Sequence, residues 1–302
     1  MSACALCGLG EAAGAPPPLA PLIRDIEDYE YGVPWHSQLW ACARCGLVVQ
    51  EPRIAPADLP KLYPPTYLAH SGGSRARGVY GWLKGVLARR EAGLLARRVP
   101  PHGRIIEIGC GNGKFLSVLH EIRPDIALAG VDIADVGIAD LPGFTFYHGQ
   151  LEEVAIEPQS FDAIYCSNLI EHVPDPLKFL KKCREILKPG GVIVGITPNH
   201  LSLDRFVFGR YWAGYHYPRH TFVFNHCNIR VVLENAGFEV VQVKGSHAYW
   251  YLSLANLALE LPGTRKRGLA FAVITALFAP LDFLINRFRV HGSMTFIGRR
   301  LA

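Results

Sequence analysis

One short pattern, acidic-x-Gly-x-Gly-x-Gly, constrains the fold of this chain more than any other feature of its sequence. It begins at Glu107 and places glycines at Gly109, Gly111 and Gly113, between a short apolar run and a helical pattern. Glycines at alternate positions let the backbone turn tightly and approach a ligand closely, and the helix start that follows favours an anionic group. We therefore expect a strand–loop–helix unit that binds a cofactor.

The residues around this loop alternate between apolar runs and helical patterns. Strands are predicted at 105–108, 126–131, 161–166, 192–196, 238–243 and 294–297, with helices at 114–122 and 176–187. A turn is expected at 188–191, and a further helix is expected to have Asn225 as its N-cap and to be closed by Gly237. This alternation predicts an α/β fold, with a doubly wound, Rossmann-like parallel sheet covered by helices.

A second acidic residue, Asp132, follows the next predicted strand, where a carboxylate can accept hydrogen bonds from both hydroxyls of a ribose. With the glycine pattern, this arrangement resembles the class I S-adenosylmethionine-dependent methyltransferases. A dinucleotide-binding loop would place its third glycine where this chain has Lys114.

The resemblance continues through Gly149–Leu151, Phe161–Ile164 and Leu187–Gly191, and it covers residues 100 to 245. It implies a seven-stranded sheet and S-adenosylmethionine as the cofactor. The implied cofactor-binding residues are Glu107, Gly109, Cys110, Gly111, Gly113, Asp132, Gln150, Leu151 and Asn168.

The segment after the strand at 161–166 bears on the methyl acceptor. Methyltransferases that act on amino groups of DNA bases carry an Asn/Asp-Pro-Pro-aromatic motif here, and this chain lacks it. We expect a small-molecule acceptor and no nucleic acid.

The pair Glu171–His172 resembles that of quinone-pathway O-methyltransferases, which have a further glutamate for a divalent metal where this chain has Asn168. A Mg²⁺ site, a substrate-positioning pair and a helix-capping pair all stay open.

Histidines supply the candidate bases. A hydroxyl acceptor must lose its proton as the methyl group arrives, and the pKa of histidine suits that task. His220 is the first choice, His216 the second and His172 the third, with Glu171 beside them; a buried structural role is the alternative for each. O-methylation of a sugar, quinone or lipid-linked substrate is favoured, while a carbon or nitrogen acceptor would depend mainly on orientation.

Two Cys-x-x-Cys pairs stand near the N-terminus: Cys4 with Cys7, and Cys42 with Cys45. No signal peptide is visible, so a cytoplasmic, reducing environment is expected, where such pairs form a closed structural zinc site. The head resembles the zinc ribbons of nucleotide-sugar C-methyltransferases. The other four of the eight cysteines are expected to be buried small residues.

These patterns divide the chain into a zinc ribbon at 1–50, a linker and helical connector at 51–100, and a methyltransferase domain at 101–302. An apolar helical insertion is expected at 248–291, before the last strand. Within it, 268–285 is expected to cover the core or to contact a membrane surface peripherally, and a membrane span is disfavoured because Pro280 and Asp282 interrupt the segment.

Two other classes of function remain open. One is a cofactor-binding module without turnover, whose ribbon recognises a partner. The other is a nicotinamide-dependent oxidoreductase, against which the glycine spacing argues. The sequence fixes neither the acceptor nor the oligomeric state.

Overall fold

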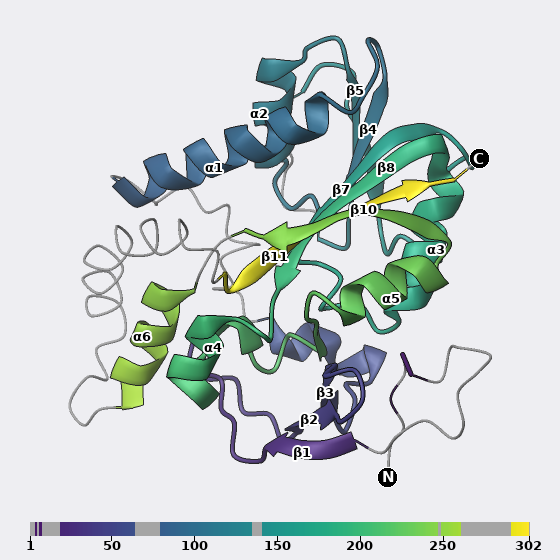
Figure 1. Ribbon diagram of the computed structural model, residues 1–302. Helices are drawn as coiled ribbons and strands as arrows, with labels where there is room; N and C mark the ends of the chain where they lie inside the picture. Colours follow the sequence, from purple (N-terminus) through teal and green to yellow (C-terminus); the bar gives the residue numbers. More distant parts are fainter. Residues whose placement is uncertain are drawn as a thin grey trace.

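The computed structural model describes residues 4, 6–7, 19–63, 79–134, 141–246, 249–260 and 291–301 of the 302-residue chain. These residues form a seven-stranded sheet with helices on both sides and a separate four-stranded sheet, which lies at the bottom of Figure 1. The apolar residues 268–285, expected to cover the core or to contact a membrane, lie outside the described residues.

The main sheet has the strand order β10-β11-β8-β7-β4-β5-β6. Its strands are β4 (Arg104–Ile108), β5 (Ala127–Asp132), β6 (Thr145–His148), β7 (Phe161–Ser167), β8 (Leu187–Pro198), β10 (Phe238–Gly245) and β11 (Ser293–Arg300). Neighbours from β8 to β6 are parallel, whereas β11 is antiparallel to both β8 and β10. The carboxyl ends of the parallel strands therefore meet at one edge, where open α/β sheets bind ligands. The predicted α/β sheet is confirmed.

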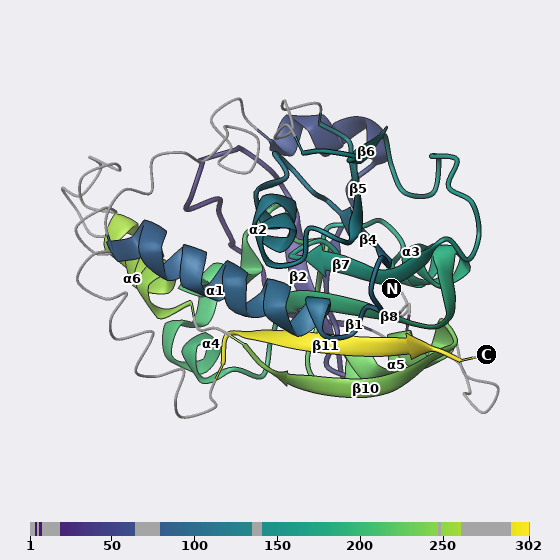
Figure 2. The same ribbon diagram turned by 90° about the horizontal axis from the view of Figure 1, so that it is seen from above.

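Helices cover both faces of this sheet (Figures 1 and 2). The helices α1 (Val79–Ala96) and α2 (Lys114–Ile122) lie on one face, and α3 (Pro176–Ile186) and α5 (Asn228–Asn235) lie on the other. Leu95 and Leu116 belong to the core of the first face, and Phe179 and Val232 to the core of the second. Burial of apolar side chains on both faces holds the sheet between its helices.

The small sheet has the order β1-β2-β3-β9, with every neighbouring pair antiparallel. Its strands are β1 (Leu19–Ile23), β2 (Gln38–Cys42), β3 (Val48–Glu51) and β9 (Phe222–Val223), and the 3₁₀-helix η1 (Pro56–Leu62) follows β3. The first three strands come from the N-terminal region, but β9 comes from the chain between β8 and α5. The N-terminal sheet is therefore completed by residues from the segment that carries His216 and His220.

Two local predictions differ from the structure. The turn expected at 188–191 is part of β8, which begins at Leu187 and pairs there with Phe161 before its register shifts. The helix α5 begins at Asn228 instead of directly after Asn225. Asn225 still acts at the helix start, because its side-chain oxygen accepts hydrogen bonds from the N–H groups of Cys227 (2.9 Å) and Asn228 (3.0 Å).

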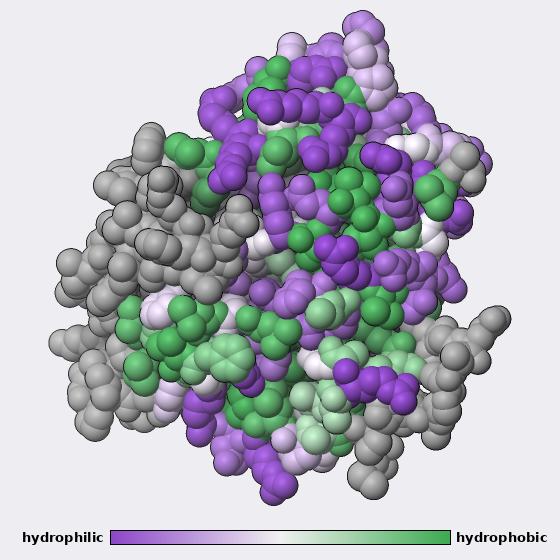
Figure 3. All heavy atoms as spheres, viewed as in Figure 1, coloured by the Kyte–Doolittle hydropathy of each residue, from purple (hydrophilic) through white to green (hydrophobic). Residues whose placement is uncertain are grey.

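Between β8 and β9 the chain forms α4 (Leu203–Phe208), η2 (Gly209–Tyr211) and η3 (Ala213–Tyr215), and between β10 and β11 it forms α6 (Trp250–Glu260). The helix α6 places helical structure within the expected insertion before the last strand. Hydrophobic side chains gather over α4 and α6 at the lower left of Figure 3, where Leu203, Phe206 and Val207 are exposed. None of the helices in the described residues has the length and apolar character that a membrane crossing requires.

Candidate functional site

The glycine loop joins the end of β4 to the start of α2. Gly109, Gly111 and Gly113 have φ values of +75°, +50° and +72°, a region that favours glycine. A side chain at Gly109 would also lie within 3.2 Å of Leu169. The loop is held against β5, because the N–H groups of Gly109 and Cys110 donate to the carbonyl of Val131 at 2.8 and 3.2 Å.

Two carboxyl groups lie beside this loop. Asp132, at the end of β5, accepts hydrogen bonds from the N–H groups of Gly111 (2.7 Å) and Ala134 (2.9 Å). Glu107 is buried on β4, and burial first, then the charges of Asp132 and Glu91, raise its pKa well above the usual range. One of its carboxyl oxygens has no hydrogen-bond partner in the part of the chain that the structure describes. A buried acceptor without a partner is unfavourable, so this site suits a ligand that donates hydrogen bonds.

A cavity of about 640 Å³ opens at the carboxyl ends of β4 and β5. Seven of the predicted site residues line it: Gly109, Gly111, Asp132, Gln150, Leu151, Asn168 and His172. The glycine loop, the acidic strand end and one candidate base therefore face a single space, large enough for a cofactor-sized ligand.

The other predicted site residues do not line this cavity. They are Glu107, Cys110, Gly113, Glu171, His216 and His220. Cys110 is buried, and its sulfur packs so closely on Gly130 of β5 that a side chain there would lie within 2.6 Å of it. Burial also raises the pKa of the Cys110 thiol, so this side chain is a packing residue.

The three candidate histidines form one cluster, although His172 is distant in sequence from the other two. The ring centroids of His172 and His220 are 4.6 Å apart, those of His216 and His220 are 5.0 Å apart, and those of His172 and His216 are 6.2 Å apart. Their different hydrogen bonds distinguish the three rings.

His216 uses both of its ring nitrogens. Its Nδ1 donates to the carboxylate of Glu30 at 2.7 Å, and its Nε2 accepts a hydrogen bond from the guanidinium of Arg219 at 3.1 Å. Neither nitrogen is left to take a proton from a substrate. The geometry fits a structural contact between the N-terminal region and the histidine segment.

His220 is buried behind the cavity wall. Its Nδ1 donates to the carbonyl of Gly214 at 2.9 Å, so the lone pair lies on Nε2, 3.8 Å from a carboxyl oxygen of Glu171. Burial first, then the neighbouring histidines, holds the pKa of His220 well below its usual value. Burial raises the pKa of Glu171 to about 8, and neither of its carboxyl oxygens has a hydrogen-bond partner among the described residues.

His172 lines the cavity, and its Nδ1 is 3.1 Å from the hydroxyl of Tyr63. Burial first, then the charge of His216, lowers the pKa of His172 to about 3, so the ring is neutral at physiological pH. Tyr63 also lines the cavity, as does Leu59. Sequence reasoning missed both, because they lie in a Pro-rich segment that reads as a connector and carries no motif.

Glu171, His172 and His220 bring three potential ligand atoms within 4.8 Å of one another. The expected third ligand position holds Asn168, whose side-chain oxygen lies 3.5 Å from the Tyr249 hydroxyl. Mg²⁺ prefers oxygen ligands, whereas this group offers two imidazoles and one carboxylate. The residues present therefore do not fit Mg²⁺.

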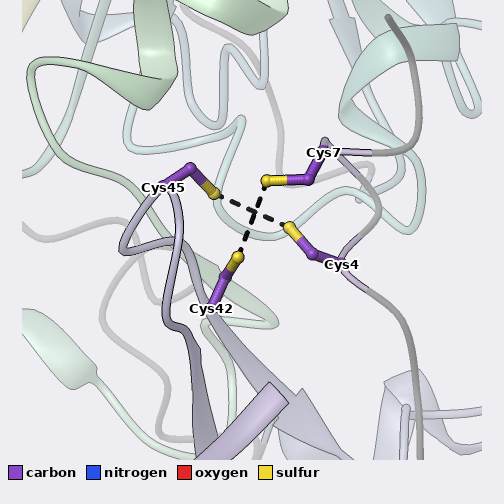
Figure 4. A group of neighbouring side chains, drawn as sticks. All are labelled: Cys4, Cys7, Cys42 and Cys45. Carbon is purple, nitrogen blue, oxygen red and sulfur yellow. Dashed lines mark hydrogen bonds between the residues drawn. The ribbon is translucent and has the colours of Figure 1, made fainter. Parts of the chain in front are cut away.

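The four N-terminal cysteines converge on one point (Figure 4). The sulfurs of Cys4 and Cys45 are 3.6 Å apart, as are those of Cys7 and Cys42. A tetrahedral zinc ion with Zn–S bonds of about 2.3 Å needs sulfurs about 3.8 Å apart, so the cluster fits zinc. Of the other four cysteines, Cys110, Cys166 and Cys183 are buried as expected, but Cys227 is exposed because it lies at the surface start of α5.

Residues 82–243 match the family model described as a methyltransferase domain, and the chain belongs to that family. The matched domain is of the class I, S-adenosylmethionine-dependent type that the glycine pattern predicts, which argues against the nicotinamide-dependent alternative.

Among curated proteins, the chain is similar to ubiquinone biosynthesis O-methyltransferases. It is 32% identical to that of Paraburkholderia phymatum over 121 residues, 37% of this chain and 51% of that protein. It is 35% identical to that of Xylella fastidiosa over 131 residues, 40% of this chain and 52% of that protein. The chain spans about half the length of these relatives.

Solved structures share the fold at low sequence identity. A phosphoethanolamine N-methyltransferase of Haemonchus contortus has a TM-score of 0.55 at 17% identity, covering 84% of this chain and 63% of that one. A chain from a Haloferax volcanii complex of the Trm112 activator with a methyltransferase has a TM-score of 0.53 at 19% identity, covering 78% and 96%. At these identities the likeness supports the fold alone.

Proposed function

We propose that this methyltransferase transfers a methyl group to a hydroxyl oxygen of a small, largely apolar acceptor, and that His172 takes the hydroxyl proton. The observation that carries the proposal is the position of His172. It is the candidate base that lines the same cavity as the glycine loop and Asp132.

The cofactor is assigned to the glycine-loop end of the cavity. S-adenosylmethionine, when bound, supplies a methyl group already activated on a sulfonium. Asp132 is suited to accept hydrogen bonds from ribose hydroxyls, and Gln150 and Leu151 line the wall where the family places the adenine. Gly109 and Gly111 let the backbone approach the ligand closely.

The acceptor is assigned to the end of the cavity lined by Leu59, Tyr63, His172 and Val173. As the acceptor oxygen bonds to the methyl carbon and the carbon–sulfur bond breaks, the hydroxyl proton becomes acidic enough to pass to the neutral ring of His172, although burial makes that ring a weak base. When Nδ1 of His172 donates to the Tyr63 oxygen, Nε2 carries the lone pair that accepts this proton.

The apolar lining favours a ring-shaped acceptor. Leu59, Leu169 and Val173 offer apolar contacts beside the polar groups of Tyr63 and His172. This combination suits a hydroxylated aromatic ring, and the relatives named for ubiquinone biosynthesis agree with that choice. Sugar and lipid-linked acceptors belong in the same screen.

Cofactor binding is tested first. We expect calorimetry to detect S-adenosylhomocysteine binding to the protein and a loss of tenfold or more in affinity, about 1.4 kcal/mol, for Asp132→Ala. Asp125→Ala, at a partly exposed carboxylate between α2 and β5, serves as the control and should bind normally. If the folded protein does not bind S-adenosylhomocysteine, the proposal fails.

The acceptor class is tested by methyl transfer from labelled S-adenosylmethionine to catechol, with aniline as the amine counterpart. We expect methylation of catechol, and we expect His172→Gln to lower kcat by roughly 10²-fold or more while leaving S-adenosylhomocysteine affinity unchanged. Transfer to aniline alone, or full activity of the variant, would contradict O-methylation with His172 as base.

A further inference from the structure

Tyr63 reaches the cavity from a part of the chain that precedes the methyltransferase sheet. It follows η1, and its hydroxyl lies 3.1 Å from Nδ1 of His172, which also lines the cavity. Because η1 is not part of either sheet, contacts other than strand pairing hold the backbone next to Tyr63.

Arg219 fixes that backbone. Its guanidinium is fully buried and donates to the carbonyl of Leu62, the residue before Tyr63, at 3.1 Å. It also donates to the carbonyl of Tyr217 at 3.2 Å and to His216 at 3.1 Å. One side chain thus joins the η1 segment to the segment that carries the histidines.

Asp28 holds Arg219 in place. Its two carboxylate oxygens accept hydrogen bonds from the two terminal nitrogens of the guanidinium at 3.0 and 2.7 Å, a bidentate pair. The same carboxylate accepts N–H groups of Glu30, Tyr31 and Val33 at 3.0 to 3.1 Å. Both side chains of the pair are almost completely shielded from solvent.

Burying an ion pair is costly, and removing one partner of such a pair is strongly destabilising because the other charge stays buried without compensation. This pair joins three segments, around Asp28, Leu62 and Arg219, and the last two border the cavity or the histidine cluster. The N-terminal region therefore does more than carry the four cysteines, because it also sets the position of one cavity wall.

The geometry points to Tyr63 as an acceptor-contacting residue, with Asp28 and Arg219 as the positioning residues that hold it against His172. This inference rests on the proposed function for the identity of the acceptor, but the positioning of Tyr63 against His172 by the pair does not depend on that identity.

The positioning is tested by nuclear magnetic resonance on protein labelled with ¹⁵N in its histidine rings, with the His172 signals assigned by their loss in His172→Gln. We expect Tyr63→Phe to shift the His172 Nδ1 signal, and Asp28→Asn and Arg219→Lys to shift the same signal. Asp125→Asn is the matched control, because Asp125 also forms a bidentate pair with an arginine, Arg123, but at a partly exposed site. Its spectrum should equal that of the unsubstituted protein.

Two binding readouts complete the test. Tyr63→Phe, Asp28→Asn and Arg219→Lys should keep S-adenosylhomocysteine affinity within threefold and raise the KM for catechol at least fivefold. An unchanged His172 signal in folded Asp28→Asn or Arg219→Lys would overturn the positioning role. An unchanged KM in Tyr63→Phe would overturn the acceptor contact.

Failures of the two proposals can be told apart. If catechol is not methylated or S-adenosylhomocysteine is not bound, the proposed function fails, whereas the ring signals of His172 still decide the positioning. If Asp28→Asn does not fold, two milder variants test the positioning of Tyr63 instead. Arg219→Lys keeps the positive charge but loses the bidentate guanidinium, and Tyr63→Phe removes only one hydroxyl.

Discussion

Burial keeps several histidines of this protein neutral, and His200 shows the effect away from the cavity. The ring is 7% exposed, and its Nε2 lies 3.3 Å from the hydroxyl of Tyr215. Burial first, then the charge of Arg205, lowers its pKa to about 3. In the unfolded chain His200 takes up a proton as the pH falls below 6.5, whereas in the folded chain it stays neutral. The contribution of neutral His200 to the free energy of unfolding is therefore fully present above pH 6.5. That stabilisation is lost as the pH falls from 6.5 towards 3.

We expect His200→Gln to lose less stability than the unsubstituted protein on acidification. The difference in the free energy of unfolding between pH 7 and pH 4 should shrink by about 3 kcal/mol, from the pKa difference over that range. Urea unfolding at the two pH values measures it, with exposed His226→Gln as the control. Equal losses in His200→Gln and the unsubstituted protein would contradict the argument.

Single residues differ in how far sequence alone can assign them. Gly109, Gly111 and Asp132 lie near one another along the chain, so their spacing was enough to predict one site, and the structure brings them to one cavity. Sequence alone could not predict which of the three histidines is best placed to act as the base. That depends on the hydrogen bonds that His216 forms with Glu30 and that His220 forms with Gly214. Those partners are set by tertiary contacts and not by local pattern.

At the scale of elements, close packing between β8 and β11 depends on a glycine. A side chain at Gly195 of β8 would overlap the ring of Phe296, which is fully buried on β11. The two residues face each other in the antiparallel register of these strands. The absence of a side chain at Gly195 thus makes room for a large aromatic side chain in the core.

We expect Gly195→Ala to destabilise the protein by about 1–3 kcal/mol, the usual cost of overpacking a core. Combining it with Phe296→Leu should cost less than the sum of the two single changes, because the smaller side chain relieves the overlap. Denaturant unfolding of the four proteins forms the double-mutant cycle. Simple additivity would mean that the overlap is relieved elsewhere.

Elements also mark where prediction from sequence ends. Strands such as β4, β5 and β7 were predictable because each is a mostly apolar run of strand length. The two-residue strand β9 was not, because so short a strand has no period of its own and exists through its pairing with β3.

For the molecule as a whole, the four-cysteine cluster is joined to the methyltransferase side. The carbonyl of Cys45 accepts hydrogen bonds from the side-chain amides of Asn225 (3.0 Å) and Asn228 (3.2 Å), at the start of α5. Val48 and Val49 of β3 pair with β9. Loss of a metal at the cysteines should therefore affect more than the N-terminal sheet.

We expect the purified protein to contain one zinc ion per chain and Cys45→Ser to lose it, since closed four-thiolate sites contribute directly to folding. Elemental analysis measures the zinc, and thermal unfolding should show a lower Tm for the variant. Cys227→Ser, at an exposed cysteine, is the control and should keep both. If the unsubstituted protein contains no zinc and Cys45→Ser leaves the Tm unchanged, the cysteines do not form a structural zinc site.

The pairing of β3 with β9 has a consequence for how such an enzyme can evolve. The family match begins at residue 82, yet the sheet that β9 completes and the wall that Tyr63 provides both come from earlier in the gene. A recombination event that replaced the segment from β1 to Tyr63 would exchange one wall of the cavity and leave the glycine loop untouched. A different N-terminal segment could thus bring specificity for a new acceptor. The incoming segment must keep an edge strand that pairs with β9 and a carboxylate that pairs with Arg219.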